Sequence, residues 1–118
     1  MPYIHVSSNV AAAGIDTDAF ARALSKSLAG SLGAPEQLLL AKLSLGSPML
    51  MAKKSDPCAF VEIRSAQLDP KKNPAIVKAV TETVTATLGV SPKRIFVNLQ
   101  EIPPTHWGFN GATAASRL

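Results

Sequence analysis

The sequence of 118 residues contains one cysteine, two histidines and few aromatic side chains. With Cys58 alone, the chain has no partner for an internal disulfide and no basis for a cysteine-based zinc cluster. His5 and His106 lie far apart in the sequence and do not have the spacing of metal ligands. We therefore expect no metal site, and we interpret Cys58 as a small buried apolar residue.

Long apolar runs are also missing. No stretch approaches the ~20 consecutive apolar residues that a membrane-spanning helix needs. The N-terminus also lacks the basic region followed by a long apolar region that marks a signal peptide. These features predict no membrane insertion and a cytoplasmic location, and they leave export without a signal peptide open.

The sequence also lacks a cluster of charge of one sign. The net charge is +4, but the twelve basic residues are scattered, and no aromatic RNA-binding motif accompanies them. We interpret the charge as a solvated surface and expect no nucleic-acid partner. At 47% hydrophobic and 17% charged residues, the composition is that of one folded domain over residues 1–118.

The sequence does contain an internal repeat, with halves at about 2–45 and 58–101 and a tail at 102–118. In each half, apolar residues recur every four positions, the spacing of one helix face. These residues are Phe20, Leu24, Leu28 and Leu32 in the first half, and Ile76, Val80, Val84 and Leu88 in the second. The offset between these two sets also separates Gly33 from Gly89, and Ile4 from Phe60.

Each half reads as strand, helix and strand. The expected strands are 3–8, 38–44, 58–66 and 94–100, and the expected helices are 17–32 and 74–88. Asp16 or Thr17 can cap the first helix, Asn73 can cap the second, and Gly33 and Gly89 can end them. A helical crossover makes the strands of each half parallel. The pattern predicts an α+β fold with a four-stranded mixed sheet, both helices on one face and a short extra strand near Trp107–Phe109.

Two of the expected strands are apolar at successive positions, in Leu38–Ala41 and Ile95–Val97. Both faces of the sheet therefore need cover, and two helices can cover only one face. A chain of this length has nothing left for the other face, so we expect the protein to self-associate.

Pro2 directly follows the initiator Met1 and opens the first expected strand. If Met1 is removed, Pro2 becomes an N-terminal secondary amine. Burial disfavours the charged form of an amine and lowers its pKa from the ordinary value near ~8. Such an amine could act as a base at neutral pH, whereas the alternative is an inert second residue.

The chain resembles the macrophage migration inhibitory factor and D-dopachrome tautomerase family of the tautomerase superfamily. The resemblance spans nearly the whole chain and rests on the order and spacing of short motifs. These are Met1-Pro2, Ser8-Asn9-Val10, Leu32-Gly33 with Pro35, Pro48-Met49, Ser55-Asp56-Pro57, Ser91-Pro92 with Arg94 to Val97, and Trp107 to Gly111 with Thr113. It implies a homotrimer whose sheets line a central barrel, with active sites between subunits.

The resemblance also implies a reaction, the keto–enol tautomerisation of phenylpyruvate-like and dopachrome-like compounds. Pro2 would be the catalytic base, and no metal or cofactor would be needed. The partner would be a small aromatic keto acid. Asn98 and the aromatic Phe109 match positions that line the family's substrate pocket.

The chain departs from the family's pattern at several pocket positions. After the glycine that ends the first helix, the family usually has a lysine, and this chain has Ala34. The loss of this lysine predicts weakened activity. Leu38 stands where the family often has an aromatic residue, and Phe96 stands where it has a tyrosine. The segment that is usually Ser-Ile-Gly-Gly in the family begins here with Ser65 and Ala66. These residues remain candidates for binding the substrate.

Two other cations are candidates for binding the substrate's carboxylate. Lys42 occupies the repeat position that matches Asn98, and Arg64 lies near the pocket segment of the third strand. The alternative for each is an ordinary salt bridge. The sequence thus supports a tautomerase, or a cytokine-like protein or host-directed mimic with vestigial catalysis and a protein receptor. A third hypothesis is a related reaction on a different acid.

Overall fold

The computed structural model describes residues 1–117 of the chain. Its main elements are β1 (Tyr3–Ser8), α1 (Thr17–Leu32), β2 (Leu40–Ser44), β3 (Ala59–Ser65), α2 (Asn73–Leu88), β4 (Ile95–Glu101), β5 (Gly108–Phe109) and β6 (Ala112–Thr113). The predicted helices and main strands are all present, with small shifts at their ends. The expected strand 38–44 begins only at Leu40, because residues 36–38 form a 3₁₀ turn.

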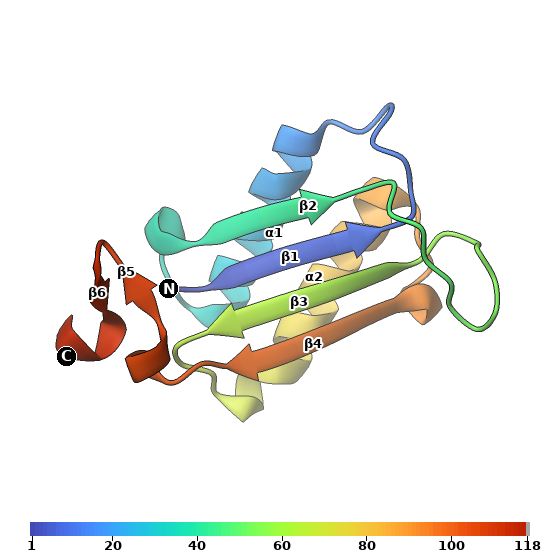
Figure 1. Ribbon diagram of the computed structural model, residues 1–118. Coiled ribbons are helices and arrows are strands. Elements are labelled where there is room, and N and C mark those ends of the chain that lie inside the picture. Colours follow the sequence, from blue (N-terminus) through green and yellow to red (C-terminus); the bar gives the residue numbers. More distant parts are fainter. Residues whose placement is uncertain (118) are drawn as a thin grey trace.

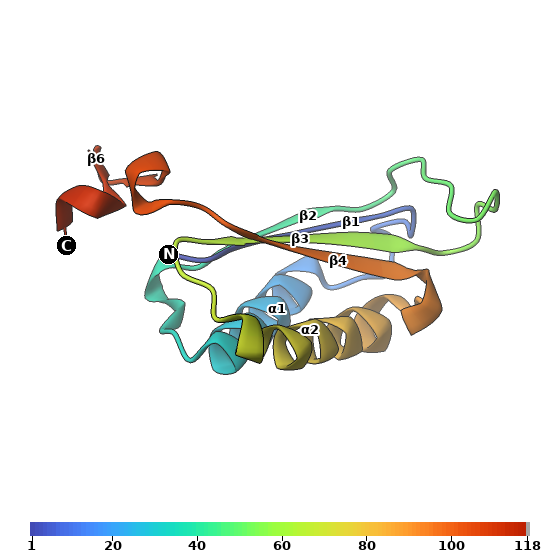
Figure 2. The same ribbon diagram turned by 90° about the horizontal axis from the view of Figure 1, so that it is seen from below.

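The sheet has the strand order β2-β1-β3-β4. β1 pairs in parallel with β2, and β3 pairs in parallel with β4, as predicted for the two halves. The halves join where β1 and β3 run antiparallel. Both helices lie on one face of this sheet, as Figure 2 shows from below. The predicted α+β fold with a mixed four-stranded sheet is confirmed.

The core lies between the helices and one face of the sheet. Side chains alternate between the two faces along a strand, so Ile4 and Val6 of β1 point to the helices and are fully buried. The apolar repeats of α1 and α2 pack against them. Cys58 is also buried, as expected. No helix within residues 1–117 is long and apolar enough to span a bilayer.

The helix ends largely follow the sequence signals. The Asp16 carboxylate accepts the Ala19 N–H at 3.0 Å and caps α1. Gly33 and Gly89 end the two helices in the left-handed conformation, with φ of 71° and 70°. The predicted cap at Asn73 is wrong: this residue is helical, and its buried side-chain oxygen has no hydrogen-bond partner.

Gly89 and Gly30 give a matched pair of substitutions with opposite expected effects. An added Cβ meets no atom within 4 Å at either glycine, so the backbone conformation alone decides the outcome. Gly89→Ala forces alanine into a left-handed conformation and should destabilise the protein by roughly 1 kcal/mol. Gly30→Ala lies inside α1 and should stabilise it by about 0.5–1 kcal/mol. Urea unfolding of both variants measures this, and equal shifts would contradict it.

The second face of the sheet is open. Phe96 and Leu40 project from this face with exposed fractions of 62% and 61%. A polar row crosses the sheet between them, where the register aligns Lys42, His5, Glu62 and Asn98. The expectation that apolar side chains would remain uncovered on this face is therefore confirmed for the single chain.

The C-terminal segment lies beyond one end of the sheet. Its hairpin of β5 and β6 is near the N-terminus and the end of β3, whereas the loop between β2 and β3 extends from the opposite end (Figure 1). The predicted short strand near Trp107 is confirmed as β5. This arrangement places residues from both termini around Pro2.

Candidate functional site

Pro2 is buried at the start of β1. Its carbonyl oxygen accepts the Leu40 N–H at 3.1 Å, which extends the parallel pairing of β1 and β2 by one step. The Pro2 nitrogen lies in the peptide bond to Met1 and so has neither a proton nor a basic lone pair. Removal of Met1 would convert it into an amine held at the end of an inner strand of the sheet.

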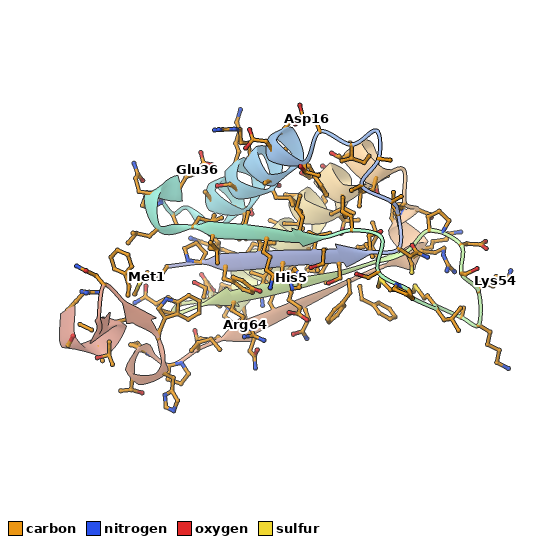
Figure 3. All side chains as sticks on the ribbon, turned by 45° about the horizontal axis from the view of Figure 1, so that its top comes forward. Met1, His5, Asp16, Glu36, Lys54 and Arg64 are labelled. Atoms are coloured by element: carbon orange, nitrogen blue, oxygen red, sulfur yellow. The ribbon has the colours of Figure 1, made fainter. Side chains whose placement is uncertain are left out.

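Two cavities meet at Met1 and Pro2. The first has a volume of about 610 Å³ and lies between the end of α1, the end of β3 and the C-terminal segment. The second has a volume of about 490 Å³ and lies between the start of β2, β3 and the β5 hairpin. Figure 3 shows Met1 at this end of the sheet, beside the C-terminal segment. A residue at position 2 is thus accessible to ligands from both cavities.

The first cavity is lined by both apolar residues and polar or charged ones. Ser65 and Ala66 contribute the end of β3, and Ala34 contributes the segment after α1. Lys72 and Arg117 add two cations, and Asp69 adds one anion. Ser65 is buried, and its carbonyl oxygen accepts the Ile102 N–H at 2.8 Å, which fixes the end of β3 against the C-terminal segment.

The second cavity is more apolar. Leu38, Trp107 and Phe109 line it together with Pro2. Arg64 has the one cationic side chain among the residues that line it, and its guanidinium lies 5.8 Å from the centre of the Tyr3 ring. Such a cation–aromatic contact leaves the N–H groups at the guanidinium edge free to bind an anion.

The structure brings six of the nine predicted site residues to these two cavities. Pro2, Arg64, Leu38 and Phe109 line the second cavity, and Ser65 and Ala66 line the first. The other three, Lys42, Phe96 and Asn98, line neither cavity. They lie on the open face of the sheet, as strand alternation and exposure show. Within one chain they are not part of the site around Pro2.

His5 occupies the middle of the open face. Its ring nitrogens lie 2.8 Å from the Ser44 hydroxyl and 3.7 Å from the Glu62 carboxylate. Figure 3 shows His5 and Arg64 on different strands of this face. Within residues 1–117, the side chains of His, Cys, Asp and Glu nowhere gather in threes that could hold a metal ion.

The sequence interpretation missed Lys72 and Arg117 as residues of the site. Lys72 reaches the first cavity from the turn before α2, and Arg117 reaches it from the last turn of the chain. Only an indirect feature of the sequence could have indicated Lys72. The last turn of α1 contains no basic residue of its own, so its free carbonyl groups favour a cation from elsewhere.

The family model of macrophage migration inhibitory factor (MIF) matches residues 1–115. The chain is 27% identical over 116 residues to MIF-like protein mif-2 of Caenorhabditis elegans, with 98% of this chain and 96% of that protein covered. The crystal structure of a homologue from Prochlorococcus marinus matches with a TM-score of 0.89 and 29% identity, over 94% of this chain and 97% of the other. A fused wild-type 4-OT symmetric trimer matches with a TM-score of 0.81 and 26% identity, over 98% and 97% of the two chains.

Proposed function

Because the chain belongs to the macrophage migration inhibitory factor family, we propose that it is a cofactor-free keto–enol tautomerase with Pro2 as its base. The substrates would be phenylpyruvate-like and dopachrome-like compounds. One observation carries the proposal: position 2 is buried at the junction of two cavities of ligand size. The role of Pro2 as a base requires that Met1 is removed.

Burial favours the neutral form of the Pro2 amine and lowers its pKa toward neutral pH. The free amine takes a proton from the carbon beside the keto group. The electron pair of the broken C–H bond forms the C=C bond of the enolate, and the π pair of the C=O bond moves to the carbonyl oxygen. The protonated amine then returns its proton to that oxygen, which gives the enol. Atoms and charge balance over the two steps without a metal or an oxidant.

The two cavities would bind different parts of such a substrate. Leu38, Trp107 and Phe109 form an apolar wall for the aromatic ring in the second cavity. Cations are available on both sides of Pro2 for the carboxylate and the developing enolate. Ser65 and Ala66 form the part of the first cavity that adjoins the end of β3.

The active form would be a homotrimer. Its support is the exposed apolar surface at Phe96 and Leu40, together with the similarity to a protein described as a symmetric trimer. In such an assembly, Lys42, Phe96 and Asn98 of one subunit would reach the Pro2 site of a neighbour. This would account for three site residues that one chain leaves apart.

The experiment is a tautomerase assay with phenylpyruvate and with dopachrome methyl ester. It uses protein whose mass shows that Met1 has been removed and whose oligomeric state has been measured by light scattering. Turnover of either compound supports the proposal, provided that the turnover depends on Pro2. A correctly processed oligomer that turns over neither compound would contradict it.

A second candidate function is an interaction protein with vestigial catalysis, located in the cytoplasm or exported without a signal peptide. The loop between β2 and β3 favours it. Leu50 in this loop is 74% exposed, and Ala52 and Lys53 have positive φ. Arg94 fixes the loop by donating hydrogen bonds to the carbonyl oxygens of Pro57, Met51, Lys54 and Asp56. Burial of Leu50 against a protein receptor would be favourable, because it would remove apolar surface from water.

A further inference from the structure

We propose that Lys72 binds the carboxylate of the keto acid in the first cavity, an inference that rests on the proposed function. Lys72 ends the 3₁₀ turn Pro70–Lys72 and lines this cavity together with Pro2. No motif of the sequence assigned it a role.

The ammonium group of Lys72 is anchored at the C-terminal end of α1. Its Nζ donates to the Leu32 carbonyl oxygen at 3.2 Å and lies 3.5 Å from the position that a Cβ of Gly33 would occupy. Leu32, Gly33 and Ala34 form the adjoining wall of the cavity. The positive charge therefore lies against this wall, although Lys72 follows it in the sequence by many residues.

The ammonium group also retains hydrogen-bonding capacity. It has three donors, and Leu32 uses one of them. Among the described residues, no carboxylate lies within salt-bridge distance of Lys72. The acidic residue of the cavity, Asp69, instead accepts the Lys71 N–H at 3.0 Å. With Arg117 as a second cation, the cavity has an excess of positive charge that attracts a small anion.

This placement changes the expected consequence of Ala34. The resemblance predicted weakened activity because a lysine is missing after Gly33. Lys72 brings a lysine ammonium group to the same wall from a different element. The loss at position 34 is therefore compensated within this chain, and Arg64 in the second cavity is not needed as the carboxylate partner.

The alternative is that Lys72 only stabilises α1, because a cation near a helix C-terminus is favourable. The two roles differ in their dependence on the substrate. Lys72→Gln removes the charge, and Lys71→Gln is the matched control from the same turn, since Lys71 does not line either cavity. Lys72→Arg preserves the charge, and Arg64→Gln tests the competing cation.

We expect Lys72→Gln to raise KM for phenylpyruvate by about 10-fold and to leave KM for its methyl ester within about 2-fold. Lys72→Arg should retain most of the wild-type affinity for phenylpyruvate, and Lys71→Gln should have the wild-type KM. Equal effects on acid and ester would overturn the inference and leave a structural role. A larger effect on the acid from Arg64→Gln would overturn it in favour of the second cavity.

Binding of 3-phenylpropanoate tests the same contact without turnover. This acid has the length of phenylpyruvate but no keto group, so its affinity does not depend on Pro2 acting as a base. By calorimetry, we expect Lys72→Gln to weaken binding about 10-fold and the double variant Ala34→Lys/Lys72→Gln to regain it. Unchanged binding in Lys72→Gln, or no binding to the wild type, would overturn the inference. If binding depends on Lys72 but the protein has no activity, only the proposed function fails.

Discussion

Pro2→Gly is expected to lower kcat/KM for phenylpyruvate by at least about 100-fold, the lower limit of what a positioned general base contributes. The substitution replaces a secondary amine fixed by its ring with a primary amine on a freely rotating residue. Glycine keeps the carbonyl group that accepts the Leu40 N–H, so the start of β1 should remain paired with β2. The measurement is steady-state kinetics beside light scattering and thermal unfolding.

A second variant separates the role of the amine from that of the proline ring. Inserting one alanine between Met1 and Pro2 leaves the ring in place but keeps its nitrogen in a peptide bond after Met1 is removed. This variant should be as inactive as Pro2→Gly. If either variant kept wild-type activity with phenylpyruvate, Pro2 would not be the base.

Much of the fold could be predicted because local signals agreed with one another. The period of four in the two helices, the capping carboxylate of Asp16 and the left-handed stops at Gly33 and Gly89 each set element bounds within a few residues. The failure at Asn73 has a local cause. Asp69, Pro70 and the following lysines form a 3₁₀ turn that leads directly into α2, so Asn73 is already helical.

The site was only partly predictable, because its residues come together through tertiary structure. Pro2, Arg64 and Leu38 lie near strand ends, so a repeat of strands and helices places them at the same end of the sheet. Lys72 contacts Leu32 across the space between α1 and the turn before α2, a contact that periodicity does not report. Phe96 and Asn98 project from the open face and line neither cavity, so no contact within one chain joins them to Pro2.

The largest expected loss of stability is from Phe20→Ala, at about 3–5 kcal/mol. Phe20 is the largest fully buried side chain, with an exposed fraction of 1%, and it lies in the core between α1 and the sheet. Truncation removes its burial and leaves a cavity that the surrounding aliphatic residues fill only in part. Urea unfolding, followed by circular dichroism at a fixed protein concentration, measures the loss. A change below about 1 kcal/mol would mean that the core around Phe20 differs from the one described.

Phe96→Ala is the matched control, because it removes the same atoms from an exposed position on the open face. For an isolated chain, its effect on the free energy of unfolding should stay within about 0.5 kcal/mol. In an oligomer that covers this face, the same substitution would remove a subunit contact, and its effect would depend on protein concentration. The two phenylalanines therefore separate the stability of the core from that of the assembly. A concentration-dependent loss at Phe96, with a constant loss at Phe20, is the result expected if the Pro2 site is completed by a neighbouring subunit.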